Sequence, residues 1–415
     1  MAKKLDKKRL LIYSLVFSPD GVSTAYLYND IALGFMKNNY EVIVLTTTPH
    51  YNRIQESIDR QPLKKRILGL FYTSDYQGIK IYHIPLKKYK SSLLRVLSFV
   101  YWHLASLAVG FFLRKVNIIL TPSPPLTNGL IAILLARLKG SKSIYNVQEI
   151  YPDLLINHRR LTNKFVIKFL KILESIVYNG SDAVTTIDKI FYNTIKTRIK
   201  NKTKLKVISN FVDTEFYGVN SSISLPEVFN KVKGNIDMVY AGNIGLAQEW
   251  DLVINLAKEI NKHPITIWII GEGAKKNYLE SQIQKHKLNN IKLLPYQERK
   301  YMPSINLFAD FHFIAMDKKM ENDGFPSKVY AIMASAKPMI VVSSNNTPII
   351  SFLKETNAAL LITEHSISVF KKAVLKLAAD KNLRNLLGDN GRRIVEQKFT
   401  KQHVVNQYLE LANNI

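Results

Sequence analysis

The most constraining feature of this chain is a repeated alternation of short apolar runs with longer segments of helical spacing. In the first half the apolar runs cover Leu10–Phe17, Glu41–Thr46, Ile79–Ile84, Asn117–Leu120, Ser143–Gln148, Ala183–Thr186 and Leu205–Ile208. Helical patterns lie between them, over Ala25–Asn38, Leu93–Lys115, Leu126–Lys139, Lys164–Asn179 and Lys189–Lys200. Strands that are apolar on both faces and separated by helices predict a parallel sheet covered on both sides.

The same alternation starts again after a loop-like stretch. The second set of strands is expected at Asp237–Tyr240, Ile265–Ile270, Ile291–Leu294, Phe311–Ile314, Met339–Ser343 and Ala359–Ile362. We therefore predict an α/β protein with two Rossmann-like domains, over residues 1–210 and 236–398, joined by a linker at 211–235. Residues 399–415 form a final helix that we expect to pack back toward the first domain. Ligands of such sheets bind beyond the carboxyl ends of the strands, so a cleft between facing domains is the expected site.

The charge of the chain is strongly positive. Lys and Arg number 58, Asp and Glu 32, which gives a formal net charge of +26. Nucleic acid, an anionic membrane and anionic small substrates are therefore all candidate partners, although a biased composition would give the same excess. The chain has no cysteine, no zinc-ligand spacing and no basic stripe with interleaved aromatic residues, which argues against nucleic acid.

Two apolar stretches raise the question of a membrane. The first, Leu10–Phe17, is short and lacks a cleavage pattern, so we interpret it as a buried strand and not as a signal peptide. The second, Val96–Leu113, reaches the lower limit of membrane-spanning length and has Arg95 on one side and Arg114 and Lys115 on the other. A span would separate strands of one sheet, so we favour a core helix or a helix lying in the membrane interface.

Three predicted strand-to-helix junctions carry residues suited to a ligand. Gly21 follows the first strand and permits a close backbone approach. Gln148, Glu149 and Asp153 follow a buried strand, where polar groups are costly unless they face a cleft or solvent. Glu149 is a candidate base or substrate-orienting group, and a helix-capping or solvated acid is the alternative. Gly242, Asn243 and Gly245, with Gly271 after the next strand, suit a cradle of backbone N–H groups for an anion.

A fourth junction contains a lysine at an unusual place. Pro326 suits the first position of a helix, so Lys328 falls in the first turn. The helix dipole is positive there and disfavours a cation by a few tenths of a kcal/mol. A bound phosphate would reverse this preference, whereas a solvated lysine would need no ligand.

In these motifs the chain resembles the enzymes of glycosyltransferase family 4, which have the two-domain GT-B architecture. The similarity covers nearly the whole chain and is most like the WbuB-like branch of surface-polysaccharide glycosyltransferases. It rests on FSPDGVSTAYLYNDIA, EVIVLTTTPHYN, TPSPPLTNGLIAILLARLKG, VQEIYPD, VISNFVDTEFY, YAGNIGLAQEWDLVINLA, GEG, LFAD and GFPSKVYAIMASAKP. Each motif is weak alone, but their combination in this order is specific.

The resemblance implies a metal-independent, retaining transfer of a sugar from a nucleotide diphosphate. It places the nucleotide, UDP in our prediction, on the C-terminal domain and the acceptor on the N-terminal domain. By position, the implied donor-binding residues are Gly21, Gly242, Asn243, Gly245, Gly271, Leu294, Pro295, Tyr296, Phe325, Pro326 and Ser327. Asp323 falls where the family's first acid contacts the donor sugar, and Lys328 lies at the phosphate-binding helix start. Gln148 and Asp153 would bind the acceptor, and Asp323, Lys328 and Glu149 are the implied catalytic set.

This chain departs from the family pattern at three places. Ala331 stands where many members have a ribose-binding Glu, so ribose recognition must differ. Asn243 and Gln248 stand where many members have Arg and Lys, which leaves Lys328 as the nearest cation for a diphosphate. Many members have His where this chain has Gln148 or Glu149, so the acceptor side departs from the family pattern as well.

We therefore expect a glycosyltransferase that moves a sugar, an N-acetylated amino sugar in our prediction, to a lipid-linked glycan in O-antigen, capsule or exopolysaccharide assembly. The chain would lie on the cytoplasmic face of the cell membrane as a peripheral protein held by anionic lipids. Two alternatives remain at this level: a nucleotide-sugar 2-epimerase of the same architecture, and a non-catalytic sugar-binding scaffold.

Overall fold

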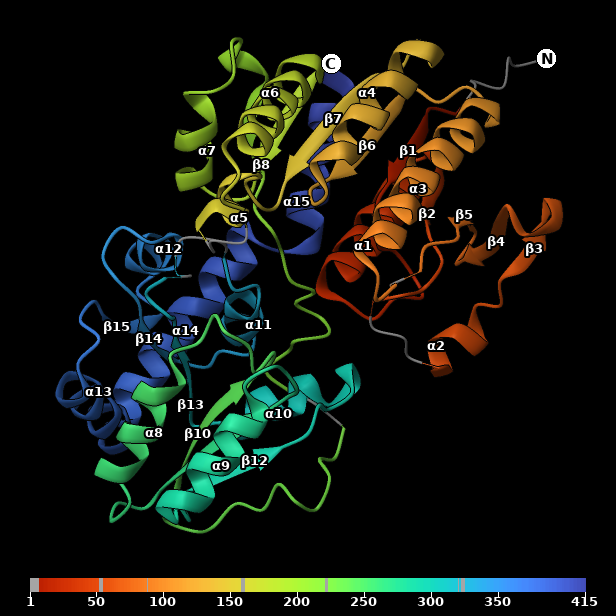
Figure 1. Ribbon diagram of the computed structural model, residues 1–415. Coiled ribbons are helices and arrows are strands. Elements are labelled where there is room, and N and C mark those ends of the chain that lie inside the picture. The colour runs from red at the N-terminus through yellow and green to blue at the C-terminus, as the bar shows by residue number, and fades with distance from the viewer. Residues whose placement is uncertain are drawn as a thin grey trace. The chain divides into compact units, whose positions relative to one another are not determined.

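The computed structural model shows two α/β units (Figure 1). It describes residues 7–51, 55–87, 89–157, 161–220, 223–319, 321 and 325–415. The first unit contains residues up to Asn210 together with Val404–Ile415, and the second contains Phe211–His403. Each unit is built around a sheet with helices on its faces, as the alternation in the sequence predicts.

The sheet of the first unit has nine strands in the order β3-β4-β5-β2-β1-β6-β7-β8-β9. The pairs from β5 through β9 are parallel, whereas β3, β4 and β5 form an antiparallel edge that the sequence analysis did not predict beyond β5. The strands are β1 (Arg9–Tyr13), β2 (Glu41–Thr47), β3 (Lys64–Arg66), β4 (Phe71–Tyr76), β5 (Ile79–Ile84), β6 (Ile118–Pro122), β7 (Lys142–Val147), β8 (Ala183–Thr186) and β9 (Leu205–Val207).

Helices connect and cover these strands. They are α1 (Ser23–Lys37), α2 (Gln55–Arg60), α3 (Ser92–Phe112), α4 (Leu126–Lys139), α5 (Asp153–Asn157), α6 (Lys164–Gly180) and α7 (Lys189–Lys196), with the short 3-10 helices η1 (Ile67–Gly69) and η2 (Lys202–Lys204). α3 and α4 share one apolar core with β1, β2, β5 and β6. The helix α15 (Lys401–Asn414) also packs in this unit from Val404 on, since Val405 fills the space beside Gly34 in α1.

The sheet of the second unit has six parallel strands in the order β12-β11-β10-β13-β14-β15. They are β10 (Ile236–Ala241), β11 (Ile265–Ile270), β12 (Ile291–Leu294), β13 (Phe311–Ala315), β14 (Met339–Val342) and β15 (Ala359–Ile362). The helices are α8 (Trp250–Glu259), α9 (Lys276–His286), α10 (Met302–Phe308), α11 (Lys328–Ala334), α12 (Pro348–Thr356), α13 (Ile367–Ala379) and α14 (Lys381–Lys398), with η3 (Arg299–Tyr301).

Alternate residues of one central strand show how this sheet is covered. Ile340 and Val342 of β14 belong to a core formed with α8, α9 and α13. Met339 and Val341 belong to a second core, formed with α11, α12 and α14. Successive side chains of a strand point to opposite faces, so both faces of the sheet are buried. This explains why the strands are apolar runs without alternation.

The segment 211–235, expected as a linker, contributes to the cores of the second unit. Val212 is buried with α11, α12 and α14, and Phe229 stacks on Trp268 with ring centroids 5.5 Å apart. The hydrogen bond from Val212 N to the carbonyl of Phe399 is 3.0 Å long. The segment that we expected to be a linker is thus packed against the second unit at Val212 and Phe229.

Candidate active site

Two loops meet at the carboxyl ends of β10 and β11. The parallel register pairs Ala241 with Ile270, which brings the following residues, Gly242 and Gly271, side by side. A Cβ on Gly271 would lie 1.9 Å from the carbonyl oxygen of Gly242, far inside van der Waals contact. Both residues also have φ values, 147° and 152°, that side chains rarely adopt. Glycine at these positions therefore permits the two loops to pack backbone on backbone.

The backbone N–H groups of these loops divide into two sets. Those of Gly242, Ile244 and Gly271 donate to backbone carbonyls, at 2.8–3.0 Å, and hold the loops together. Within the described ranges, the N–H groups of Asn243 and Gly245 have no such acceptor. The anion cradle expected from the sequence is thus reduced to these two donors, because the other N–H groups maintain the loop.

Lys328 lies directly beneath Gly242. A Cβ on Gly242 would be 2.5 Å from its Nζ atom, so glycine is also what allows the ammonium group to reach the loop. The Nζ atom lies 3.5 Å from the centroid of the Tyr240 ring, a cation–π contact. The Tyr240 hydroxyl in turn donates to the carbonyl of Asn243, at 2.6 Å. Tyr240, which the sequence analysis missed as a site residue, therefore supports both the loop and the lysine.

The environment of Lys328 changes its acidity. Burial lowers the pKa of the Lys328 ammonium from 10.5 to about 7. In the described part of the chain, no carboxylate forms an ion pair with it. A cation held in a desolvated place without an acidic partner is stabilised by an incoming anion.

The helix that carries Lys328 begins slightly later than the sequence predicts. α11 starts at Lys328 with Ser327 as its N-cap, not at Pro326, because the carbonyl of Pro326 accepts from Val329 N in a preceding turn. Ser327 is exposed, whereas the ring of Phe325 packs against Tyr330 and Phe352. Phe325 therefore anchors the turn from within a cluster of aromatic rings.

Two further predicted positions bear on the donor. Asp323 lies outside the described residues, and so do its neighbours Asn322 and Gly324. Ala331, in place of the ribose-binding Glu, packs at the edge of the core formed by α11, α12 and α14.

An acid–histidine–acid cluster around the buried Glu321 lies next to this segment and was not predicted. Glu321 accepts hydrogen bonds from Ser344 N at 2.8 Å and from the Ser343 hydroxyl at 3.2 Å. Its carboxylate is 3.6 Å from His365 Nε2, and the Nδ1 atom of the same ring is 3.4 Å from Glu249. His365 follows β15, so the rule that directs attention to the carboxyl ends of strands would have found it.

Pro295 and Tyr296 follow the edge strand β12. The register pairs Ile270 with Leu294, so these two residues begin beside Gly271. Tyr296 is 49% exposed, which leaves its ring available to stack on a base. The expected base-binding positions therefore lie at the same sheet edge as the glycine loops.

In the first unit, the loop that contains Gly21 is held in place by hydrogen bonds of Asp20 and Ser18. The buried carboxylate of Asp20 accepts from the backbone N–H groups of Tyr51 and His50, at 3.1 and 3.4 Å. The Ser18 hydroxyl donates to Gln61, at 2.6 Å. The bonds of Asp20 join the loop after β1 to the loop after β2, and the bond of Ser18 joins it to the residue that follows α2. Of these residues, only Gly21 was predicted from the sequence.

The predicted acceptor-side residues follow β7. The Ser123 hydroxyl accepts from the N–H groups of Gln148 and Glu149, at 2.9 and 3.2 Å, and so fixes this turn. The Gln148 amide exchanges hydrogen bonds with that of Asn210, at 2.9 and 3.0 Å. Glu149 is partly exposed on the same turn.

Asp153 belongs to an ion-pair group at the start of α5. Its carboxylate is paired with the Arg198 guanidinium, which also contacts Glu174 at 2.8 Å. Burial raises the pKa of Glu174, and the nearby Arg198 charge opposes this shift. The two ion pairs of Arg198 tie α5 and α6 to the turn that follows α7, so Asp153 has a structural partner in addition to any acceptor.

Comparison with known proteins identifies the second unit. The family model "Glycosyl transferases group 1" matches residues 222–394. The protein is a glycosyltransferase. This confirms the resemblance to glycosyltransferase family 4 that the motifs indicated.

Relatives and solved structures extend this likeness over both units. The colanic acid biosynthesis glycosyl transferase WcaI of Escherichia coli K12 is 22% identical to this chain over 426 residues, which cover 97% of this chain and 98% of WcaI. Sucrose-phosphate synthase from Thermosynechococcus elongatus superposes on this chain with a TM-score of 0.74 at 12% identity. The match covers 98% of this chain and 99% of the synthase chain. Anabaena HepE, in complex with UDP, gives a TM-score of 0.71 at 12% identity, and the match covers 98% of this chain and 100% of the HepE chain. The glycosyltransferase thus has the GT-B fold.

Proposed function

We propose that this glycosyltransferase moves a sugar from a nucleotide-diphosphate donor to a lipid-linked glycan, with retention of configuration, in surface-polysaccharide assembly. UDP is the proposed nucleotide and an N-acetylated amino sugar the proposed cargo. The observation that carries the donor part is the buried Lys328 ammonium under the glycine loop. The name of WcaI, which refers to colanic acid biosynthesis, and the UDP bound to HepE support the assignment of polysaccharide and nucleotide.

Lys328 would act on the leaving group. Cleavage of the bond to the sugar leaves negative charge on the β-phosphate, and a cation already in place stabilises that charge. The N–H groups of Asn243 and Gly245 would add two donors from the same loop, and Asp323 would contact the donor sugar. The electron pair of the broken bond stays with the nucleotide diphosphate, while the acceptor hydroxyl forms the new bond and loses its proton.

The reaction is proposed to need no metal. In the described ranges, no group of three or more His, Cys, Asp or Glu side chains has the arrangement of a metal site. Lys328 would then supply the charge that a divalent cation supplies elsewhere. Transfer should continue unchanged in excess EDTA, and loss of activity that Mg²⁺ or Mn²⁺ restores would contradict this part of the proposal.

Glu149 is proposed to orient or deprotonate the acceptor hydroxyl. The backbone turn that carries it is fixed by Ser123, whose hydroxyl accepts from the N–H groups of Gln148 and Glu149. Gln148 and Asp153 lie on the same segment, and their described contacts are to Asn210 and Arg198. Gln148 and Asp153 would then contact the acceptor only at their remaining polar atoms.

The decisive experiment combines a panel of UDP-sugars with polyprenyl-diphosphate-linked sugar acceptors and follows the product by mass spectrometry. The anomeric configuration of the product, determined by NMR, tests retention. Transfer by the wild type and its loss in Lys328→Met would support the proposal. Absence of transfer with every donor would overturn it, and epimerisation of a UDP-sugar without acceptor would replace it with an isomerase.

A further inference from the structure

The exposed apolar side chains of this protein are concentrated on one set of elements in the first unit. Well over half of the large apolar residues that are exposed in the described ranges lie on α3, α4, α6 and η1 with the adjoining Leu70. We call this set the apolar face. It consists of Ile67, Leu68, Leu70, Leu93, Leu94, Val96, Leu97, Phe99, Val100, Tyr101, Leu104, Phe111, Phe112, Leu130, Leu134, Leu138, Phe165, Val166, Phe169, Ile172 and Ile176. Such a concentration is unusual for a surface that meets only water.

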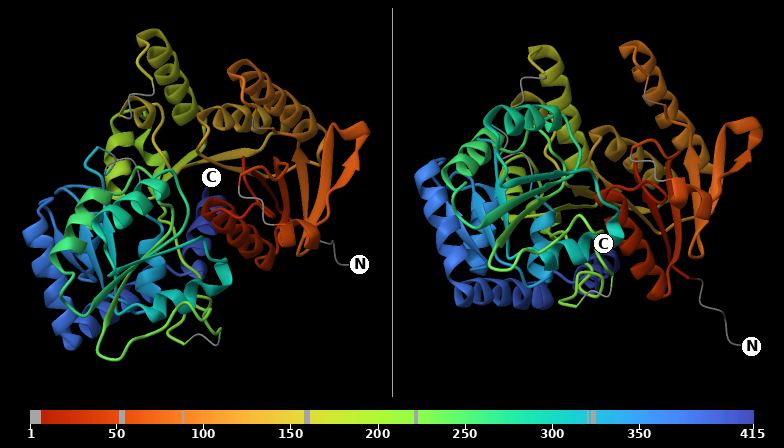
Figure 2. Two further views of the ribbon diagram at one scale, coloured as in Figure 1. Left: turned by 60° about the horizontal axis from the view of Figure 1, so that its bottom comes forward. Right: turned by 90° about the horizontal axis from the view of Figure 1, so that it is seen from below.

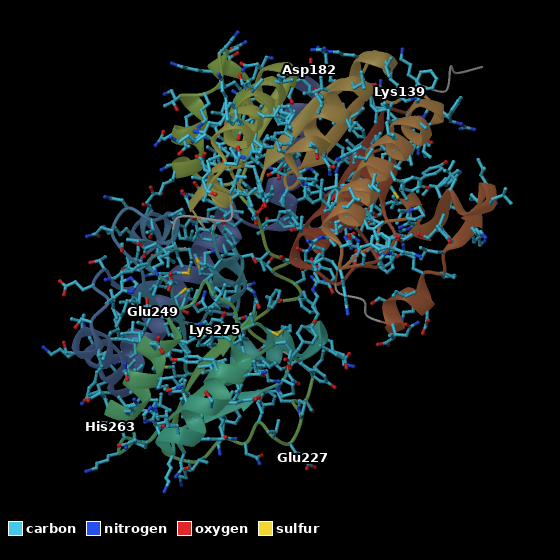
Figure 3. All side chains as sticks on the ribbon, in the orientation of Figure 1. Lys139, Asp182, Glu227, Glu249, His263 and Lys275 are labelled. Atoms are coloured by element: carbon cyan, nitrogen blue, oxygen red, sulfur yellow. The ribbon has the colours of Figure 1, made fainter. Side chains whose placement is uncertain are left out.

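The elements of the apolar face are in contact with one another. α4 packs against α3 on one side and against α6 on the other, and Figure 2 shows α3 and α6 as two ridges that project from the first unit. The Tyr101 hydroxyl donates to the carbonyl of Leu70, at 2.9 Å, which joins η1 to α3. Lys139, labelled in Figure 3, donates to the carbonyl of Leu113, at 2.6 Å, and joins the ends of α4 and α3.

α3 itself is only partly covered by the unit. Trp102, Ala105, Ser106 and Val109 are buried against the sheet at helical spacing, while most of the other large apolar side chains of α3 are exposed. Among the described helices, Leu93–Phe112 meets the length and hydropathy of a membrane span, but only 28% of it is buried. It connects β5 and β6, which lie in one sheet. This topology favours a helix that lies along a membrane over one that crosses it.

The charges around the apolar face are of one sign. α3 and α4 contain no acidic residue, and the single acid of α6, Glu174, is buried and paired with Arg198. The exposed charged residues on and beside these elements are Lys64, Lys65, Arg66, Arg95, Arg114, Lys115, Arg137, Lys164, Lys168 and Lys171. A second copy of this chain would bring the same positive charges together, which is unfavourable. Anionic lipid headgroups complement them, because each Lys or Arg near an anionic surface adds to the attraction.

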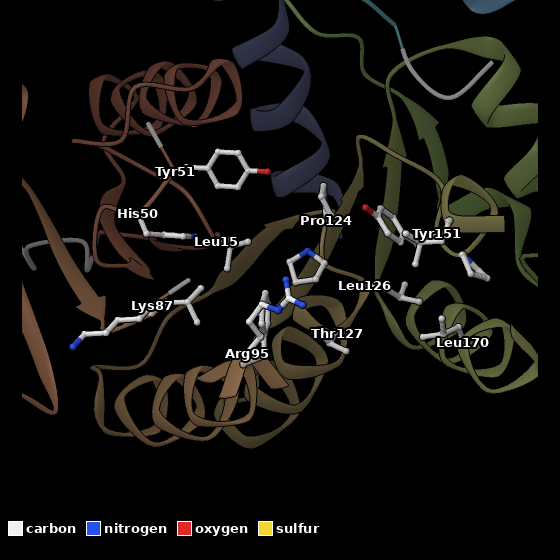
Figure 4. Close-up of a pocket in the computed structure, with 15 residues that line it drawn as sticks. Leu15, His50, Tyr51, Lys87, Arg95, Pro124, Leu126, Thr127, Tyr151 and Leu170 are labelled. Atoms are coloured by element: carbon white, nitrogen blue, oxygen red, sulfur yellow. The ribbon is translucent and has the colours of Figure 1, made fainter. Parts of the chain in front are cut away.

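An apolar cavity of about 370 Å³ lies between α3 and α6, at the start of α4. Its wall includes Phe99 of α3, Leu126 of α4, Leu155 of α5 and Leu170 of α6. Figure 4 shows Arg95 pointing into the middle of this cavity, whereas the ammonium end of Lys87 points away. The cavity therefore offers a hydrocarbon surface with one guanidinium group, at the lower end of the ~300–1,000 Å³ range of ligand pockets.

The cavity adjoins the proposed acceptor side. Tyr151 and Pro152 form part of its wall, and they follow Gln148 and Glu149 within one short loop. A molecule with its hydrocarbon part in the cavity would have its polar end close to this loop. The helices on both sides of the cavity, α3 and α6, are those that carry most of the apolar face.

We propose that the apolar face lies against an anionic bilayer and that the cavity holds the first part of the hydrocarbon chain of the lipid-phosphate acceptor. Arg95 contacts the phosphate next to this chain, and the sugar extends toward Glu149. The remainder of the chain stays in the bilayer beside α3 and α6. This inference rests on the proposed function for the identity of the acceptor, but its tests measure lipid binding and do not depend on sugar transfer.

The apolar face is tested with vesicles. The triple variant Leu104→Gln, Leu134→Gln, Phe169→Gln changes one exposed residue on each of α3, α4 and α6, whereas Val219→Gln, Val232→Gln, Leu386→Gln changes three exposed apolar residues of the second unit. We expect the wild type and the control to sediment with vesicles of equal parts phosphatidylcholine and phosphatidylglycerol. The face variant should bind roughly tenfold more weakly. Equal binding by all three proteins, or none by the wild type, would overturn the assignment of the face.

The cavity is tested with farnesyl diphosphate, in saturating UDP to fill the donor site. Inorganic pyrophosphate and farnesol separate the contributions of phosphate and hydrocarbon. We expect the wild type to bind farnesyl diphosphate at least tenfold more tightly than pyrophosphate. Leu170→Gln should reduce this binding roughly tenfold, and Arg95→Gln should weaken binding of farnesyl diphosphate but not of farnesol.

The outcomes distinguish this inference from the proposed function. If pyrophosphate binds as tightly as farnesyl diphosphate, or if Leu170→Gln binds the latter like the wild type, the cavity is not a lipid site. Circular dichroism and an unchanged UDP affinity verify that each variant is folded. Lipid binding without any sugar transfer would remove the proposed function and leave the membrane surface. Transfer to soluble acceptors without lipid binding would remove the membrane surface and the lipid-linked acceptor and leave only the sugar transfer.

Discussion

At the scale of single residues, Lys328 has a lowered pKa that makes the stability of the protein depend on pH. Its pKa in the folded protein is about 7, below the ordinary 10.5, because the ammonium group is buried between Tyr240 and Gly242. The unfolded chain therefore binds more protons than the folded one between about pH 7 and 10.5. By linkage, this residue makes the protein more stable as pH rises through that window, and the penalty is largest below pH 7.

The same shift predicts that nucleotide binding takes up a proton. At pH 8 the free protein holds Lys328 largely neutral, whereas a bound diphosphate restores the charged form. We expect calorimetry of UDP binding at pH 8, in buffers of different ionisation enthalpy, to show an uptake of close to one proton. Lys328→Met should abolish the uptake and weaken UDP binding roughly 10–100-fold, the effect of losing one charged partner. Lys371→Met, at an exposed ion pair, is the control, and an uptake that persists in Lys328→Met would refute the assignment.

Glu149 gives a second test at this scale. If it acts on the acceptor hydroxyl, Glu149→Gln should lower kcat by roughly a hundredfold while the affinity for UDP stays unchanged, because the donor is bound by other residues. Steady-state kinetics with the acceptor and calorimetry with UDP measure the two quantities. A loss of UDP affinity, or a kcat close to that of the wild type, would move the acid–base role elsewhere.

At the scale of elements, the glycine loops after β10 and β11 depend on backbone contact. Gly271→Ala puts a methyl group into the carbonyl of Gly242, so one loop must move. We expect a loss of about 1–3 kcal/mol in the free energy of unfolding and a weaker affinity for UDP. Gly234→Ala is the matched control, since its φ is also positive, at 83°, but a Cβ there meets nothing within 4 Å. Denaturant unfolding compares the two, and equal losses would show that strain alone is responsible.

The cluster of Glu321, His365 and Glu249 joins the segment before α11 to β14, β15 and α8. Glu321→Gln should cost about 1–3 kcal/mol of unfolding free energy, because the replacement leaves buried donors without their charged acceptor. The exposed pair of Glu259 and Lys371 offers a control, where Glu259→Gln should cost under about 1 kcal/mol. Thermal unfolding of both variants is the measurement, and a Glu321→Gln protein as stable as the control would show that the cluster carries no stability.

At the scale of the whole molecule, the positive charge has a definite place in the first unit. Much of it surrounds the apolar face, so both apolar contact and charge contribute to the proposed attachment. Raising the ionic strength from about 0.05 to 0.5 M shortens the Debye length and should release a large part of the bound protein from anionic vesicles. Vesicles of phosphatidylcholine alone should bind more weakly at any salt concentration. Salt-independent attachment would assign the binding to apolar contact only.

The sequence by itself determined the architecture. Apolar runs such as Ile79–Ile84 and Ile265–Ile270 match β5 and β11 residue for residue, because burial on both faces leaves a local pattern. The antiparallel edge was missed because β3, Lys64–Arg66, is exposed and carries no apolar signal. The glycine loops at the carboxyl ends of strands, and Lys328, were predicted as site residues from local sequence patterns as well, and their role stays a prediction.

Only the tertiary structure decided the environment of these residues. The lowered pKa of Lys328 depends on Tyr240 and Gly242, which come from another strand and loop, and no pattern near position 328 contains them. The cluster of Glu321, His365 and Glu249 likewise joins three distant segments. For the helix at Val96–Leu113, the sequence left two interpretations open, a core helix and a helix in the membrane interface. Its sequence alone does not reveal that α4 and α6 extend its exposed apolar surface. The desolvation of a side chain and the extent of an apolar surface depend on residues that are neighbours in space. The spacing of apolar residues that predicts strands and helices depends only on neighbours in sequence.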